Sequence, residues 1–175
     1  MKRITVKVLS LGILCLVLLI GLPYQTVKKI SAQATTEHVI TNNQQKLLTQ
    51  TIATFAPQVD ELYFSMNRDG GISINATATL SGYKLSYALA ADVADRYLYG
   101  VYHELPFVKV DFAGLYVRYE GRYVMAVGLG RHAEQRLSVR VFAPDRGIAV
   151  FQAVGDMNNT TSALIDQAYA EYKVS

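Results

Sequence analysis

The chain contains one cysteine, no tryptophan and four prolines among its 175 residues. Cys15 lies in an apolar run near the N-terminus, so the rest of the chain has no thiol with which to form a disulfide. A domain of roughly 140 residues can bury enough surface to fold without covalent cross-links. We therefore expect a hydrophobic core alone to hold the protein together.

Basic charge is scarce once the first 34 residues are set aside. The chain carries 17 Lys and Arg residues against 14 Asp and Glu residues, but five of the basic residues and none of the acidic ones precede Thr35. The remainder therefore has 12 basic and 14 acidic residues. A nucleic-acid-binding domain usually carries a basic stripe of its own, so this composition predicts no nucleic-acid partner.

The common catalytic and metal-binding motifs are also missing. The sequence has no G-x-S-x-G segment, and His38, His103 and His132 do not have the spacing of a zinc motif. The segment Gly128–Ala133 fits G-x-G-x-x-A, but the βαβ unit that a dinucleotide site needs is absent around it. We interpret these glycines as the bend at a strand end, and we expect no metal, no cofactor and no catalytic residue that sequence alone identifies.

The first 34 residues have the layout of a secretory signal. A cationic start precedes an apolar run from Val8 to Leu22, and Ala32-Gln33-Ala34 supplies small residues before a cleavage point. The run is shorter than the about 20 residues that span a bilayer, although extending it to Val27 reaches that length. Residues 1–34 are therefore either a signal peptide that is cleaved after Ala34 or an N-terminal signal/anchor helix that meets the membrane through residues 8–27.

Both alternatives place the rest of the chain outside the cytoplasm, either secreted or anchored on the outer face of the cytoplasmic membrane. The leader, the Ala-Gln-Ala segment and the cysteine-free remainder resemble exported proteins of Gram-positive bacteria in general. We interpret residues 35–42 as a polar tether and residues 43–175 as a single exported domain.

The hydrophobic pattern of that domain predicts an α+β fold. Thr41 and Gln44 match a capping box before a helix over about 43–55, and alternating apolar residues predict a hairpin over 60–80. The stretch 82–104 is apolar over most of a helical surface, so we expect a long buried helix there, with Asp95 on its narrow polar stripe.

The second half of the domain predicts further strands and a last helix. Strands over 107–119 and 122–129 are joined by Glu120-Gly121, and a second hairpin follows over 137–143 and 148–154; residues 131–136 could instead form a helical turn. A C-terminal helix runs from Asn158 through Tyr172. These local connections favour a mainly antiparallel sheet of about four to six strands, packed by the long buried helix and the terminal helices.

Tyrosine and arginine together suggest where a partner could bind. A two-residue turn at Glu120-Gly121 predicts that Arg118 lies opposite Tyr123 and Tyr116 opposite Met125. Tyrosine and arginine are enriched in recognition surfaces, although cross-strand stacking that stabilises the sheet explains the same pattern. The candidate binding residues are Tyr116, Arg118, Arg122 and Tyr123.

The sequence thus favours a non-catalytic exported domain that binds a protein partner or an envelope component at the bacterial cell surface. The first alternative is an extracellular hydrolase whose site assembles from scattered residues. A second alternative is a domain that holds a small apolar ligand between the sheet and the helix over 82–104.

The fate of the leader has a direct test. Intact-mass measurement of the exported protein is expected to give a chain that starts at Thr35, because the Ala-Gln-Ala segment has the small residues that signal cleavage requires. A mass that includes Met1 would contradict cleavage and indicate the membrane anchor instead.

Overall fold

The computed structural model describes residues 5–8, 40–67, 69–82, 84–105, 107–137, 149–161 and 163–173. In chain order its elements are β1 (Thr5–Val8), α1 (Asn42–Phe55), β2 (Val59–Met66), β3 (Ile72–Leu80), α2 (Tyr87–Tyr102), β4 (Val110–Tyr119), β5 (Arg122–Gly130), α3 (Arg131–Glu134), α4 (Ala149–Met157), the 3-10 turn η1 (Leu164–Asp166) and β6 (Ala168–Tyr172). The fold is α+β, as the hydrophobic pattern predicts.

The strands β2 to β6 form one mixed sheet of five strands in the order of the sequence, and β1 lies parallel beside β2 as a sixth. The pairs β2–β3, β4–β5 and β5–β6 are antiparallel, whereas β3 and β4 are parallel. The predicted mainly antiparallel sheet is therefore corrected to a mixed one. The reason is that α2 carries the chain back along the sheet between β3 and β4, so that both strands run in the same direction.

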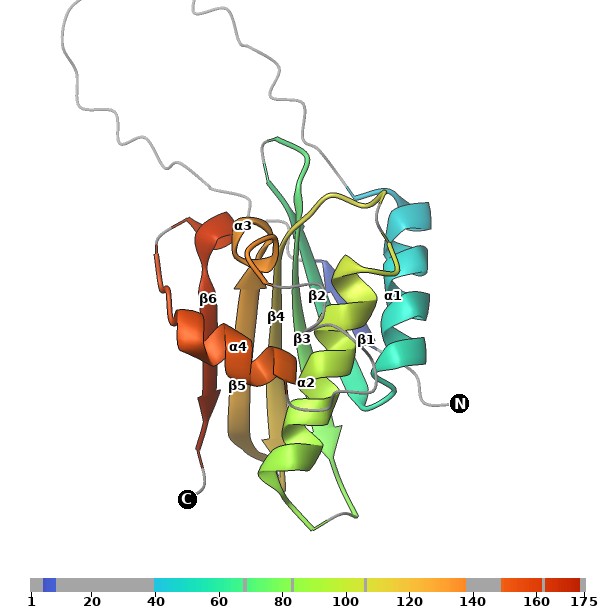
Figure 1. The fold of residues 1–175 in the computed structure, drawn as a ribbon. Coiled ribbons are helices and arrows are strands. Elements are labelled where there is room, and N and C mark those ends of the chain that lie inside the picture. Colours follow the sequence, from blue (N-terminus) through green and yellow to red (C-terminus); the bar gives the residue numbers. More distant parts are fainter. Residues whose placement is uncertain are drawn as a thin grey trace, which may run out of the picture.

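Helices α1, α2 and α4 cover one face of the sheet, and the core lies between these two layers (Figure 1). Tyr97 and Leu98 on α2 and Leu48 and Ile52 on α1 are fully buried there. The core thus explains how a domain without disulfides holds together.

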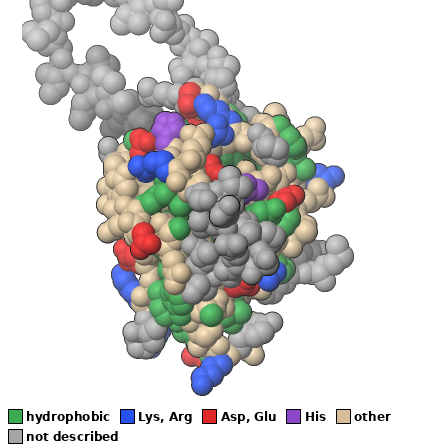
Figure 2. Space-filling view, viewed as in Figure 1, with side chains coloured by type: hydrophobic (Ala, Val, Ile, Leu, Met, Phe, Trp, Pro, Cys, Tyr) green, Lys and Arg blue, Asp and Glu red, His purple; other side chains and the backbone are tan. Residues whose placement is uncertain are grey.

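Among the described residues on the helix-covered side, Lys and Arg side chains are interspersed with Asp and Glu side chains (Figure 2).

Local signals place the first half of the chain well. Thr41 caps α1 with the predicted capping box, in which its hydroxyl accepts a hydrogen bond from the Gln44 N–H at 3.2 Å. The hairpin over 60–80 is confirmed as β2 and β3. Helix α2 begins only at Tyr87, because the hydroxyl of Ser86 accepts from the Leu89 N–H at 3.1 Å and so caps the helix at that point.

The predicted strand over 148–154 is wrong, since residues Ala149–Met157 form α4. A short apolar run does not distinguish a buried strand from a buried helix by its period. Here Val150, Phe151 and Val154 are buried on one side of a helix that packs on the sheet and on α2. Most of the partner strand predicted over 137–143 lies outside the described residues.

The predicted C-terminal helix is also wrong. Residues Leu164–Asp166 form only the turn η1, and Ala168–Tyr172 form β6. The composition of this segment suits a helix, but pairing with the open edge of β5 outweighs that weak preference. The predicted helical turn over 131–136 is confirmed as α3.

The predicted N-terminal signal/anchor helix is not confirmed. Residues 9–39 lie outside the described part of the chain, and Thr5–Val8 forms a strand. Within the described ranges, every helix is too short or too polar to cross a membrane.

At the two glycines of the G-x-G-x-x-A segment, other parts of the chain fill the space that a side chain would take. A Cβ on Gly128 would lie 2.3 Å from Cε1 of the Tyr169 ring, and a Cβ on Gly130 would lie 2.3 Å from the Leu164 carbonyl oxygen. The glycines therefore allow β6 and η1 to pack directly on β5. This close approach adds to the interpretation of these glycines as a bend, since β5 also ends at Gly130 and α3 begins at Arg131.

Asp95 is buried, with 7% of its surface exposed, and does not lie on a polar stripe as predicted. Its Oδ1 accepts a hydrogen bond from the Phe151 N–H at 2.8 Å, so this carboxyl caps the N-terminus of α4 from α2. Burial raises the pKa of Asp95 to about 7; the Phe151 and Val150 N–H groups lower it, and nearby Asp92 raises it further. The cap thus links α2 to α4, and it requires that an acidic side chain is buried.

The packing at Gly130 predicts a specific loss of stability. Gly130→Ala is expected to lower the free energy of unfolding by about 1–3 kcal/mol, because the new methyl group would meet backbone atoms that cannot rotate away. Gly155→Ala is the control, since its nearest neighbour would be 3.6 Å away. Chemical denaturation measures both variants. Equal stabilities for the two variants would contradict the close packing of η1 on β5.

Asp95 predicts a pH dependence of stability. Its pKa is raised from 3.8 to about 7 on folding, so between these values the folded chain holds a proton that the unfolded chain has lost. The contribution of Asp95 to the free energy of unfolding therefore falls as the pH rises from about 4 to about 7. In Asp95→Asn this contribution disappears while the amide oxygen can still accept the Phe151 N–H.

Denaturation of both proteins across this pH range measures the effect. The free energy of unfolding of the wild type, minus that of Asp95→Asn, is expected to decrease with rising pH by an amount on the order of a few kcal/mol. Parallel curves for the two proteins would show that Asp95 has an ordinary pKa in the folded state.

Candidate binding groove

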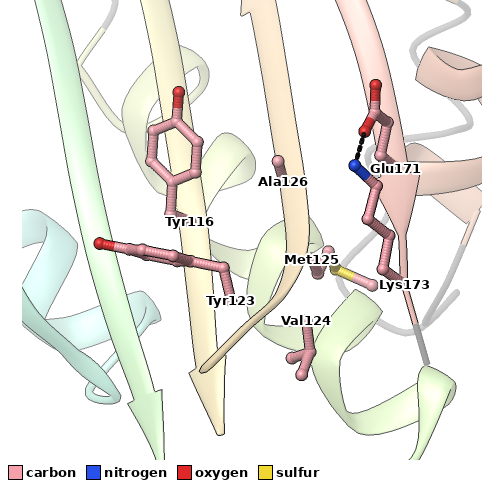
Figure 3. A pocket seen from close by; sticks show the side chains of 7 residues that line it. All are labelled: Tyr116, Tyr123, Val124, Met125, Ala126, Glu171 and Lys173. Atoms are coloured by element: carbon pink, nitrogen blue, oxygen red, sulfur yellow. Dashed lines mark ion pairs between the residues drawn. The ribbon is translucent and has the colours of Figure 1, made fainter. Parts of the chain in front are cut away.

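A groove of about 480 Å³ lies on the sheet between β4, β5 and β6 (Figure 3). Tyr116 and Tyr123 stand on one side of it and the pair Glu171 and Lys173 on the other, with Ala126 between them. Val124 and Met125 complete the lining. The small side chain of Ala126 leaves the floor open, because larger side chains flank it on both neighbouring strands.

The β4–β5 hairpin positions the two tyrosines. Glu120 and Gly121 both have positive φ, at 49° and 79°, which is the backbone that a two-residue hairpin turn requires. The predicted pairing of Arg118 with Tyr123 is confirmed. Beyond that pair the register shifts, so that Tyr116 lies opposite Ala126 and not opposite Met125 as predicted.

The register shift is a β-bulge that includes Val124 as an extra residue in β5. Met125 then pairs with Val117 and is buried in the core, whereas Ala126 takes the place opposite Tyr116 in the groove. Sequence alternation alone misses this change, because one inserted residue moves every following side chain to the other face.

The two tyrosine rings meet edge to face, with centroids 5.8 Å apart and planes at 70°. The Tyr123 side chain is 60% exposed and Tyr116 is 39% exposed. Next to them Tyr169 covers Gly128, and burial, followed by the neighbouring Tyr116, raises the pKa of Tyr169. The groove therefore offers a tyrosine surface whose outermost ring is accessible.

The two arginines of the predicted site, Arg118 and Arg122, lie in different surroundings. Arg118 donates to Glu61 Oε1 at 3.2 Å and lies 3.7 Å from Asp60 Oδ1, so two carboxylates on β2 compensate its charge. Arg122 pairs with Tyr119, whose ring packs against the core, and successive residues of a strand point to opposite faces. Arg122 thus lies on the face opposite Tyr123.

Sequence reasoning missed Glu171 and Lys173, because it placed Glu171 in a helix that ends at Tyr172, just before Lys173. Their side chains form an ion pair with an Nζ–Oε2 distance of 3.3 Å on the outer strand of the groove. One signal could have found them: Ala168, Ala170 and Tyr172 alternate with polar neighbours, which is the period of a half-buried strand.

A second polar cluster lies at α3 and η1. The Nδ1 atom of His132 is 2.9 Å from Asp166 Oδ1, and both side chains are about half exposed. Such a pair orients an imidazole in hydrolases, where a hydroxyl or thiol completes the site. The hydrogen bonds of the described residues give the His132 ring no hydroxyl or thiol partner.

Metal ligands do not gather in the described ranges, where no group of three His, Cys, Asp or Glu residues could hold an ion. No protein-family model matches the sequence. Searches of the curated proteins and of the solved structures also find no match. The chemistry of the groove itself is therefore the basis for a functional proposal.

Proposed function

We propose that this chain is a non-catalytic binding domain that acts outside the cytoplasm and holds an envelope component in the tyrosine groove. The observation that supports the proposal is the accessible Tyr123 ring beside an open floor on the sheet. Large amphipathic rings give contact area and hydrogen bonds at a small cost in side-chain entropy. Solvent exposure of such a ring on the face of a sheet suits contact with a ligand.

The charges around the groove favour an uncharged ligand. Arg118 is paired with Asp60 and Glu61, and Lys173 is paired with Glu171. A surface whose opposite charges neutralise one another generates a weak field and attracts ions of neither sign strongly. An anionic polymer would have to compete with these carboxylates for the same cations.

The groove also favours a hydroxyl-rich chain over a peptide. Its floor is the face of the sheet, where the backbone groups of β4 and β5 are paired in the ladder and cannot extend a peptide strand. The groups left for a ligand are the tyrosine rings and hydroxyls, a carboxylate and an ammonium group. Sugar rings offer C–H faces for the tyrosines and hydroxyls that can donate to Glu171 and accept from Lys173. We therefore propose a neutral polysaccharide of the envelope as the ligand.

Binding measurements on the full chain test this proposal. Tyr123→Ala is expected to weaken binding to soluble neutral oligosaccharides, or to insoluble neutral polysaccharide, by about tenfold or more, since exposed aromatic anchors carry much of a binding energy. Tyr116→Ala is expected to weaken it less, because Tyr116 is the less exposed ring.

Phe107→Ala is the matched control, because Phe107 is 75% exposed and is not among the residues that line the groove. Isothermal titration or co-sedimentation compares the variants. Equal binding by Tyr123→Ala and Phe107→Ala would contradict the groove as the binding site. Stronger binding to an anionic polymer than to a neutral one would contradict the assigned ligand class.

A further inference from the structure

The outer edge of β6 carries unpaired backbone groups. The Lys173 N–H donates to the Val124 carbonyl at 2.8 Å, and the Gln167 carbonyl accepts from Gly130 at 2.7 Å, so these residues point their backbone groups toward β5. The backbone N–H and C=O groups of Ala168 point away from β5 and exchange two hydrogen bonds with Asn159, at 2.8 and 2.7 Å. By alternation, the backbone groups of Ala170 and Tyr172 also point away from β5, and no described residue pairs with them.

The opposite edge of the sheet is β1, which pairs with β2 from Glu61 to Phe64. In the described part of the chain, the segment Ala170–Lys173 is one edge at which the sheet can accept another strand. Figure 1 shows β6 at the margin of the sheet. An unpaired edge is a template for strand addition.

The charges on this edge match those of a second copy of the same chain. Glu171 and Lys173 lie two residues apart on one face of β6 and are 61% and 78% exposed. In an antiparallel pair of β6 strands with Tyr172 opposite Tyr172, each Glu171 lies opposite the Lys173 of the other copy. Shifting the register by one residue on each strand would place Glu171 opposite Glu171, and like charges directly opposite are unfavourable.

We infer that β6 pairs with β6 of a second copy around a two-fold axis and joins two sheets into one. Tyr172 of each copy exchanges two backbone hydrogen bonds with the other. The pairs of Glu171 with Lys173 flank them in non-hydrogen-bonded positions, where side chains are closest. A closed two-fold contact of this kind uses the same surface on both subunits. It also brings two grooves side by side, because Glu171 and Lys173 line each of them.

Charge exchange on the full chain tests this inference independently of any ligand. Sedimentation velocity over a series of concentrations is expected to show a reversible monomer–dimer equilibrium. Glu171→Lys and Lys173→Glu are each expected to weaken dimerisation by about tenfold or more, since each replaces two symmetry-related attractive pairs with repulsive ones. The double variant E171K/K173E is expected to restore dimerisation, because it reverses both charges and keeps them complementary.

Asp69→Lys is the matched control. It reverses a charge in another exposed ion pair, between Lys109 Nζ and Asp69 Oδ2 at 2.8 Å, away from β6, and it is expected to leave the equilibrium unchanged. Thermal melting of every variant confirms folding. A chain that stays monomeric at all concentrations would overturn the inference. So would association that none of the β6 variants alters, which would indicate contact through another surface such as the apolar run of residues 8–22.

Discussion

The close contact of β6 with β5 is the interaction on which most other features of this protein depend. It is possible because β5 has no side chain at Gly128 and Gly130, so that the Tyr169 ring and the backbone of η1 rest on the strand itself. The contact makes β6 the last strand of the sheet and places Glu171 and Lys173 opposite the tyrosines of β4 and β5. Without it the groove would have one wall and the sheet would end at β5.

The charged groups of the domain are arranged to cancel rather than to accumulate. Arg118 is shared by two carboxylates of β2, and Lys173 is beside Glu171. Asp95 is an exception among the described residues, because it is buried, and the N–H groups at the start of α4 compensate its burial only in part. A cysteine-free domain thus relies on packing and capping, and its electrostatic field has no dominant sign to select an ionic partner.

The outcome of sequence-based prediction follows the range of the interactions involved. The capping box at Thr41, the hairpin over 60–80 and the pairing of Arg118 with Tyr123 each depend on residues close together in the chain, and all three are found. The strand predicted over 148–154 and the helix predicted after Asn158 are wrong. In both segments the local preference is weak, and contacts with α2 and β5 decide between helix and strand.

The candidate site shows the same division. Tyr116 and Tyr123 were identified from their composition and their place around a short turn, and they line the groove. The bulge at Val124 and the wall formed by Glu171 and Lys173 were not. They depend on how one strand is registered against another, and a shift of one residue reverses the face of each side chain after it.

By itself the sequence determined several local elements, namely the capping box of α1, the β2–β3 hairpin and the tight turn at Glu120-Gly121. These are encoded by hydrogen bonds and hydrophobic periods that span only a few residues. Only the tertiary structure decided that Ala168–Tyr172 is a strand, that Asp95 is buried and that a groove lies beside the tyrosines. The physical reason is that each of these features arises from segments about 40 or more residues apart, whose contact no local pattern specifies.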